Sequence, residues 1–105
     1  MNKIILLILL TVSTNVFSDV NYMTGETLIN FLRSSNSEDN IIALGYIFGV
    51  IDTHSEICDW KLAGVTGTKL VQITKNHLEK HPESWNYSAS AFVKAAISEK
   101  YPCKK

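Results

Sequence analysis

One uncharged run of the chain, from Ile41 to Ile51, predicts a central helix. Apolar side chains at positions 41, 44, 48 and 51 form one helical stripe, and those at 42, 46, 47 and 50 fill the opposite side. A helix that is apolar all round is normally a buried one. The run is too short to cross a bilayer, which needs about 20 apolar residues. We therefore expect a buried helix at the centre of the core.

Two glycines interrupt this apolar run, and a carboxylate follows it. Gly45 and Gly49 lie four positions apart and share one helix face. Each costs about 1 kcal/mol relative to alanine in a helix interior, so we expect them to permit the close approach of a neighbouring helix. Asp52 stands at the edge of the predicted core, where a carboxylate needs hydrogen-bond donors. We expect Asp52 to be a structural anchor, and a site residue is the alternative.

Three other segments repeat apolar residues at the spacing of a helix, each between polar capping residues and a break. Thr24 and Thr66 can cap two of them, and either Asn86 or Ser88 can cap the last. Ser37 can cap the central helix. The expected helices cover residues 25–33, 38–57, 67–81 and 89–101. No useful stretch alternates as a strand does, so the sequence predicts an all-α fold, a small single-domain bundle of about four helices.

The N-terminus has the pattern of a signal peptide. Lys3 precedes a short apolar stretch over residues 4–12, and Val16 and Ser18 suit the positions before a cleavage site. We therefore assign residues 1–18 to a cleaved signal peptide and residues 19–105 to one domain exported to the periplasm. The charges balance, with Lys+Arg 10 and Asp+Glu 10. A near-neutral surface gives no reason to expect nucleic acid or, after cleavage, a membrane as partner.

Two cysteines, Cys58 and Cys103, follow the ends of the second and last predicted helices. An even number of cysteines in an exported chain favours a disulfide. If it forms, the C-terminal ends of these two helices must meet, because a disulfide requires Cα atoms within about 7 Å. The alternative is a reactive Cys58 thiol with His54 as its base.

His77 and His81 share a helix face and can hold a metal ion, with Glu79 or Glu83 as a third ligand. The alternative is that His77 lies at the core edge and His81 favours the helix C-terminus. We expect the alternative, with no metal and no cofactor.

Asp52, His54 and Glu56 form a second ionisable cluster. Paired carboxylates can carry out acid–base chemistry. No motif supplies a nucleophile or an oxyanion site beside them, so we expect no enzyme activity.

Three aromatic side chains, Trp60, Trp85 and Tyr87, lie between the predicted helices. Tryptophan and tyrosine are enriched among the hot spots of protein interfaces. These residues are therefore candidates for partner binding, and the alternative is that they cover the core beneath the loops.

A set of short motifs in a fixed order gives the chain a resemblance. The motif GYIFGVID at 45–52 precedes Cys58 and a Val-Thr helix start at 65–66, and HPESWNYSASAFVKAAI at 81–97 precedes Tyr-Pro-Cys at 101–103. The order and spacing resemble those of the Rap/Tai family of type VI secretion immunity proteins. The resemblance covers about residues 25–103. Many relatives carry an additional cysteine pair, which this chain lacks.

The resemblance implies an all-α periplasmic protein that is not an enzyme. Characterised members bind cell-wall amidase effectors delivered by neighbouring cells and block their active sites, often as homodimers. The partner implied for this chain is thus a cognate peptidoglycan amidase, with a homodimer as a further assembly.

Two other functional classes stay open. A deep apolar pocket on the central helix would favour a periplasmic binding module for a ligand or an envelope protein. A third metal ligand near His77 and His81 would favour a metal-dependent hydrolase.

Overall fold

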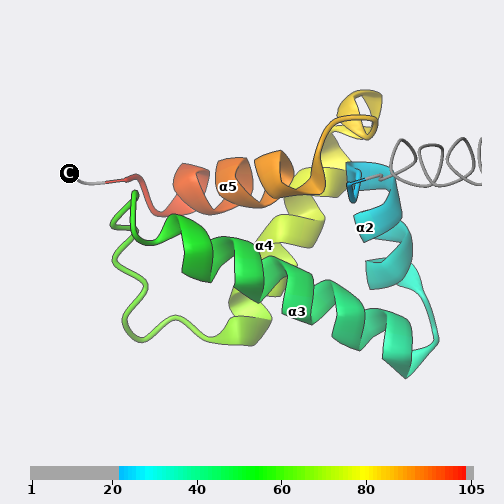
Figure 1. The fold of residues 1–105 in the computed structure, drawn as a ribbon, viewed down its shortest axis with the longest axis horizontal. Helices are drawn as coiled ribbons and strands as arrows, with labels where there is room; N and C mark the ends of the chain where they lie inside the picture. The colour runs from blue at the N-terminus through cyan, green and yellow to red at the C-terminus, as the bar shows by residue number, and fades with distance from the viewer. Residues whose placement is uncertain (1–21, 104–105) are drawn as a thin grey trace, which may run out of the picture.

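The computed structural model describes residues 22–103, so the proposed signal peptide at 1–18 lies outside the described residues. Four α-helices and one short 3-10 helix make up the fold (Figure 1). They are α2 (Gly25–Arg33), α3 (Ser37–His54), α4 (Gly67–Lys80), η1 (Pro82–Ser84) and α5 (Ala89–Lys100). The all-α prediction is confirmed. Among residues 22–103, no helix has both the length and the hydrophobicity to cross a membrane.

Each α-helix starts where a side-chain oxygen can accept a hydrogen bond from a free backbone N–H of the first turn. The hydroxyls of Thr24 and Thr66 each accept a hydrogen bond from the backbone N–H three residues later, which confirms both predicted caps. The Ser88 hydroxyl accepts from the N–H two residues later, so Ser88, one of the two predicted alternatives, caps the last helix. The central helix begins one residue earlier than predicted, because Asn36 Oδ1 accepts from the Glu38 backbone N–H at 2.8 Å.

The helices α3 and α5 run in the same direction along the molecule, with their C-terminal ends together (Figure 1). The helix α4 crosses behind them, and α2 packs against all three of the other α-helices. The buried side chains between them form one core, made of Leu28, Ile29, Ala43, Ile47, Ile51, Leu70, Leu78, Phe92, Val93 and Ile97 with several neighbours.

The start of α2 is joined to the loop before α5 by backbone hydrogen bonds. The Gly25 N–H donates to the Tyr87 carbonyl at 2.9 Å, and the Ala89 N–H donates to the Met23 carbonyl at 2.9 Å. Gly25 is buried against the Phe92 ring, and a Cβ atom at position 25 would lie 2.6 Å from ring carbon Cε2. Two helix starts far apart in sequence are thus held side by side.

The expectation that α3 is buried all round is wrong. Its buried residues are Ala43, Ile47 and Ile51, which form a single stripe. Since α2, α4 and α5 cover that stripe, the opposite side of α3 is left to solvent, and Ile41 remains 68% exposed. An uncharged helical sequence does not determine how many faces of the helix pack against other parts of the chain.

Candidate partner-binding surface

The disulfide between Cys58 and Cys103 joins the C-terminal ends of α3 and α5, as predicted. The two Cα atoms lie 5.1 Å apart, within the range that the bond requires. Cys58 is buried and Cys103 is exposed. The alternative of a free Cys58 nucleophile is therefore wrong.

Trp60 belongs to the core beside this disulfide. Its side chain is 2% exposed, and its indole Nε1 donates a hydrogen bond to Ser98 Oγ at 2.9 Å. The His54 ring packs on it at a centroid distance of 5.1 Å. A partner cannot reach so buried a ring without moving the loop, so the candidacy of Trp60 for direct partner binding is wrong in this fold. It covers the core instead.

The other two loop aromatics differ from each other. Trp85 is half-buried, its Nε1 donates to the Leu78 carbonyl at 2.7 Å, and the Arg33 guanidinium lies over its ring at 5.3 Å. Tyr87 is 62% exposed. Trp85 therefore packs at the C-terminal end of α4 and satisfies one of its last carbonyl groups. Of the three predicted aromatic residues, Tyr87 has the side chain most accessible to a partner.

The two histidines of α4 lie together, with ring centroids 4.6 Å apart. Each has its own carboxylate: His77 Nδ1 lies 3.4 Å from Glu99, and His81 Nδ1 lies 3.3 Å from Glu83. Burial and the neighbouring His81 charge lower the pKa of His77, although Glu99 acts in the opposite direction. Both rings thus take part in contacts between helix ends.

The closest group of three possible metal ligands in the described residues does not include His77 or His81. Glu79, one of the two predicted third ligands, forms an ion pair with Arg33 at 3.3 Å. Within residues 22–103, the three ligand-type side chains whose atoms lie within 4.8 Å of one another are His54, Cys58 and Cys103. The disulfide occupies both of those sulfur atoms.

The cluster of Asp52, His54 and Glu56 is also dispersed. Asp52 and Glu56 are exposed, and His54 is turned towards Trp60. The Asp52 carboxylate makes no hydrogen bond or ion pair with any residue of the described range, so its prediction as a core anchor is wrong. It stands on the part of α3 that no other helix covers.

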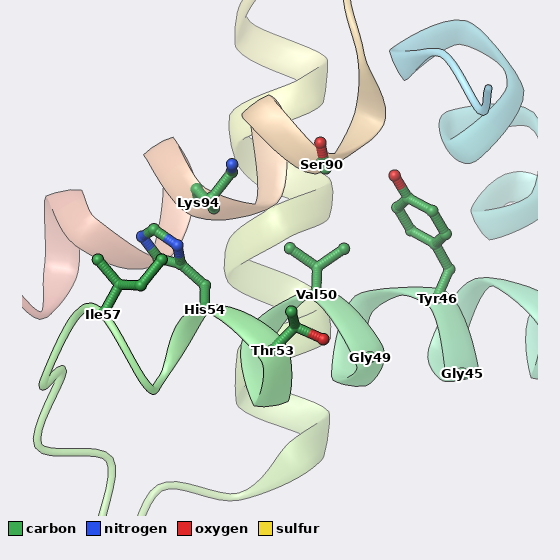
Figure 2. Close-up of a pocket in the computed structure, with 9 residues that line it drawn as sticks. All are labelled: Gly45, Tyr46, Gly49, Val50, Thr53, His54, Ile57, Ser90 and Lys94. Carbon is green, nitrogen blue, oxygen red and sulfur yellow. The ribbon is translucent and has the colours of Figure 1, made fainter.

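An apolar groove lies between α3 and α5 (Figure 2). Its volume is about 540 Å³ and its mouth is wide. In Figure 2, Tyr46 and Val50 point up from α3, and Lys94 and Ser90 lie on α5. We call it the α3–α5 groove, and its lining is Gly45, Tyr46, Gly49, Val50, Thr53, His54, Ile57, Ser90 and Lys94.

The two glycines of α3 open this groove. A Cβ atom built at Gly45 or Gly49 would meet no atom within 4 Å. The expectation that they permit close packing of another helix within the chain is therefore wrong for the described residues. The glycines that do permit close approach are Gly25, against Phe92, and Gly67, where a Cβ atom would lie 2.7 Å from the Phe48 ring.

A second apolar feature adjoins the groove on α3. Large apolar side chains remain on the helix surface on either side of the glycines. We call this set the exposed α3 face, and it consists of Ile41, Ile42, Leu44 and Phe48. Groove and face follow one another around a single helix, which makes them one continuous surface. Exposed apolar patches of this kind mark interaction sites in soluble proteins.

The sequence model of the family described as Rap1a immunity proteins matches residues 24–103. The chain belongs to the Rap1a immunity protein family. The match spans α2 to Cys103 and includes the disulfide, the groove and the exposed α3 face. Membership of an immunity family implies a protein that binds a partner effector, which agrees with the resemblance found in the sequence. A search of curated proteins finds no match.

Sequence reasoning missed the groove of this Rap1a family member, and with it Tyr46, Ser90 and Lys94. Two signals were present in the sequence. Lys94 directly follows Val93 of the apolar stripe of the last helix, so it lies beside that stripe. A charged residue there indicates where the covered side of the helix ends. The second signal was the pair of glycines, whose cost in the helix had to be explained by something outside the packed core.

Proposed function

We propose that the protein is a periplasmic immunity protein that binds a type VI secretion cell-wall amidase effector and blocks its active site by occlusion. The observation that carries the proposal is the family match over residues 24–103. The ordered motifs of the sequence, which resemble amidase immunity proteins, supply the class of effector. No enzyme activity is part of the proposal.

Two features of the chain support the periplasm as its compartment. The pattern at residues 1–18 is typical of signal peptides that direct export, and the Cys58–Cys103 disulfide is a bond that forms and persists in oxidising compartments. An amidase delivered to the cell wall acts in the periplasm. An inhibitor has to be present there when the effector arrives.

Occlusion requires a stable scaffold and a complementary surface rather than reactive groups. The scaffold is the core of four helices with its disulfide. The surface is apolar on α3 and carries the exposed Tyr87 near the start of α5. Both kinds of surface are typical of protein interfaces.

A protection assay in bacteria tests the proposal. Cells that produce a periplasmic amidase effector are scored for lysis with the full chain, with the chain lacking residues 1–18, or with neither. Protection by the full chain alone is the expected result. Lysis with the full chain across a panel of type VI amidases would contradict the proposal, and equal protection by the chain lacking residues 1–18 would contradict the periplasmic site of action.

A second function has one observation in its favour. The α3–α5 groove is an apolar pocket lined by the central helix, as expected of a periplasmic binding module for a ligand or another envelope protein. Ligand pockets bury most of the surface of a small molecule, whereas this groove is wide at its mouth. The groove therefore fits a protein surface better than an enclosed ligand, and the immunity function is the one proposed.

A further inference from the structure

The α3–α5 groove and the exposed α3 face hold most of the large apolar side chains that remain exposed among residues 22–103. Ile41 and Ile57, near its two ends, are 68% and 62% exposed. Between them, the glycine positions add no side chain, so the helix backbone itself is accessible. A partner can therefore come closer to α3 here than to any helix surface carrying side chains.

The charge of the groove is unbalanced. Its basic residues are Lys94 and His54, and neither aspartate nor glutamate lines it. Lys94 is half-buried and forms no ion pair with a residue of the described range. A partner that covers the groove will remove water from this ammonium group. Because an unpaired charge is costly to desolvate, the occupant has to supply an anionic group or lose affinity.

We propose that the α3–α5 groove and the exposed α3 face bind an apolar segment of the effector, and that a carboxylate in that segment pairs with Lys94. This inference rests on the proposed function and adds the contact surface and the chemistry of the contacting segment. The glycines form the floor on which the segment lies. Tyr46, Val50 and Ile57 supply apolar contacts along its sides.

Two other occupants fit the surface less well. A small ligand would remain largely in water, because the groove has a wide mouth. A second copy laid groove to groove would bring two Lys94 side chains together, and like charges at an interface oppose association. The exposed Asp52, one turn after Gly49 and outside the lining, would offset part of that repulsion. An acidic, apolar segment of a different protein satisfies both the shape and the charge.

The test measures binding of purified variants to a panel of catalytically inactive type VI cell-wall amidases by calorimetry. Gly49→Leu fills the floor of the groove, and Lys94→Glu reverses its charge. The matched controls are Ala95→Leu, an exposed small residue on α5 outside the groove, and Lys75→Glu, a half-buried lysine on α4 outside it. Melting curves verify that every variant is folded.

We expect Gly49→Leu and Lys94→Glu each to weaken binding by at least about thirtyfold, the effect of losing one hot spot. The controls should change the affinity by less than about threefold, as surface substitutions normally do. Gly45→Leu and Lys94→Gln repeat the two tests with different side chains, so that misfolding of one variant does not decide the outcome.

Three outcomes would overturn the inference, and they are distinguishable. If the wild type binds an amidase and all groove variants bind equally well, the contact surface lies elsewhere and the proposed function stands. If Gly49→Leu dissociates a wild-type dimer in sedimentation and leaves amidase binding intact, the occupant is a second copy. If the wild type binds no amidase in the panel, the proposed function fails and this inference fails with it.

Discussion

Four of the five glycines of the chain lie within helices, and they act in two opposite ways. At Gly25 and Gly67 a side chain would collide with an aromatic ring, whereas at Gly45 and Gly49 it would enter open space. The spacing in the sequence drew attention to the second pair, because a gap of four residues is visible as a motif. The tight pair has no such signal, since each of its members packs against a residue far away in the chain.

This contrast predicts opposite signs for the same substitution. Gly45→Ala and Gly49→Ala should each raise the free energy of unfolding by up to about 1 kcal/mol, because alanine favours the helix and meets no obstacle. Gly25→Ala should lower it by about 1–3 kcal/mol, because the buried Phe92 ring has to move. Urea unfolding of the three variants measures the signs. A loss of stability in both α3 variants would show that the glycines pack against something within the chain.

The loop aromatics also separate by burial. Trp60→Ala should cost about 3–5 kcal/mol of stability, as truncation of a buried large aromatic side chain does. Tyr87→Ala should change stability by less than about 0.5 kcal/mol, because the side chain is exposed. Thermal unfolding compares the two directly. Equal melting temperatures for Trp60→Ala and the wild type would contradict the core position of Trp60.

At the scale of the elements, α4 and α5 meet through a histidine whose charge state depends on pH. The lowered pKa of His77 means that the folded protein takes up this proton at a lower pH than the unfolded chain does. The unfolded state therefore binds more protons below the usual histidine pKa of about 6.5. The contribution of His77 to stability is complete above that pH and is lost as the pH falls through the lowered pKa.

We expect the wild type to lose melting temperature between about pH 7.5 and about pH 5.5, and the His77→Gln variant to lose less. Lys75→Gln, on the same helix, serves as the control and should follow the wild type. The measurement is a pair of melting curves for each protein. If His77→Gln loses as much as the wild type, the pH dependence comes from other groups.

The disulfide holds the C-terminal ends of α3 and α5 together. It closes a loop with a sequence separation of 45, and its removal should cost about 2–4 kcal/mol by the chain-entropy argument. The double variant Cys58→Ala with Cys103→Ala tests this in urea. Addition of a reductant should destabilise the wild type and leave the double variant unchanged. A wild type that is insensitive to complete reduction would contradict the argument.

The helix positions were predictable because their signals are local. Threonine and serine caps, the proline after α4 and the apolar stripe of α5 each act within a few residues. Which side of α3 is buried and which is exposed was not predictable, because this depends on where the three other helices pack. The same limitation applies to Trp60, whose hydrogen-bond partner Ser98 is distant in the chain, and to Lys94, which becomes part of a groove only when α3 lies alongside.

At the scale of the whole molecule, the proposed export and the stability of the fold are linked through the disulfide. Protein recovered from the periplasm should be two hydrogen atoms lighter than the reduced chain and should react with no thiol reagent, because the disulfide forms there. The chain lacking residues 1–18, retained in the cytoplasm, should have two reactive thiols and a lower melting temperature. Mass analysis and thiol labelling of both preparations check this. Full labelling of the exported protein without reduction would exclude the bond in that compartment.

The disulfide also changes what a protease can accomplish. Cys58 precedes the exposed connection to α4, and Cys103 follows α5, so every peptide bond between them lies inside a covalent ring. A single cut in the connection before α4 or in the loop before α5 opens the ring and releases nothing, because the last helix stays bonded to the end of α3. The nicked chain would keep its helices tethered at high local concentration, and they could pack again around the same core. In an envelope that contains proteases, a small protein of this topology tolerates a first cleavage that would divide an unlinked bundle into two.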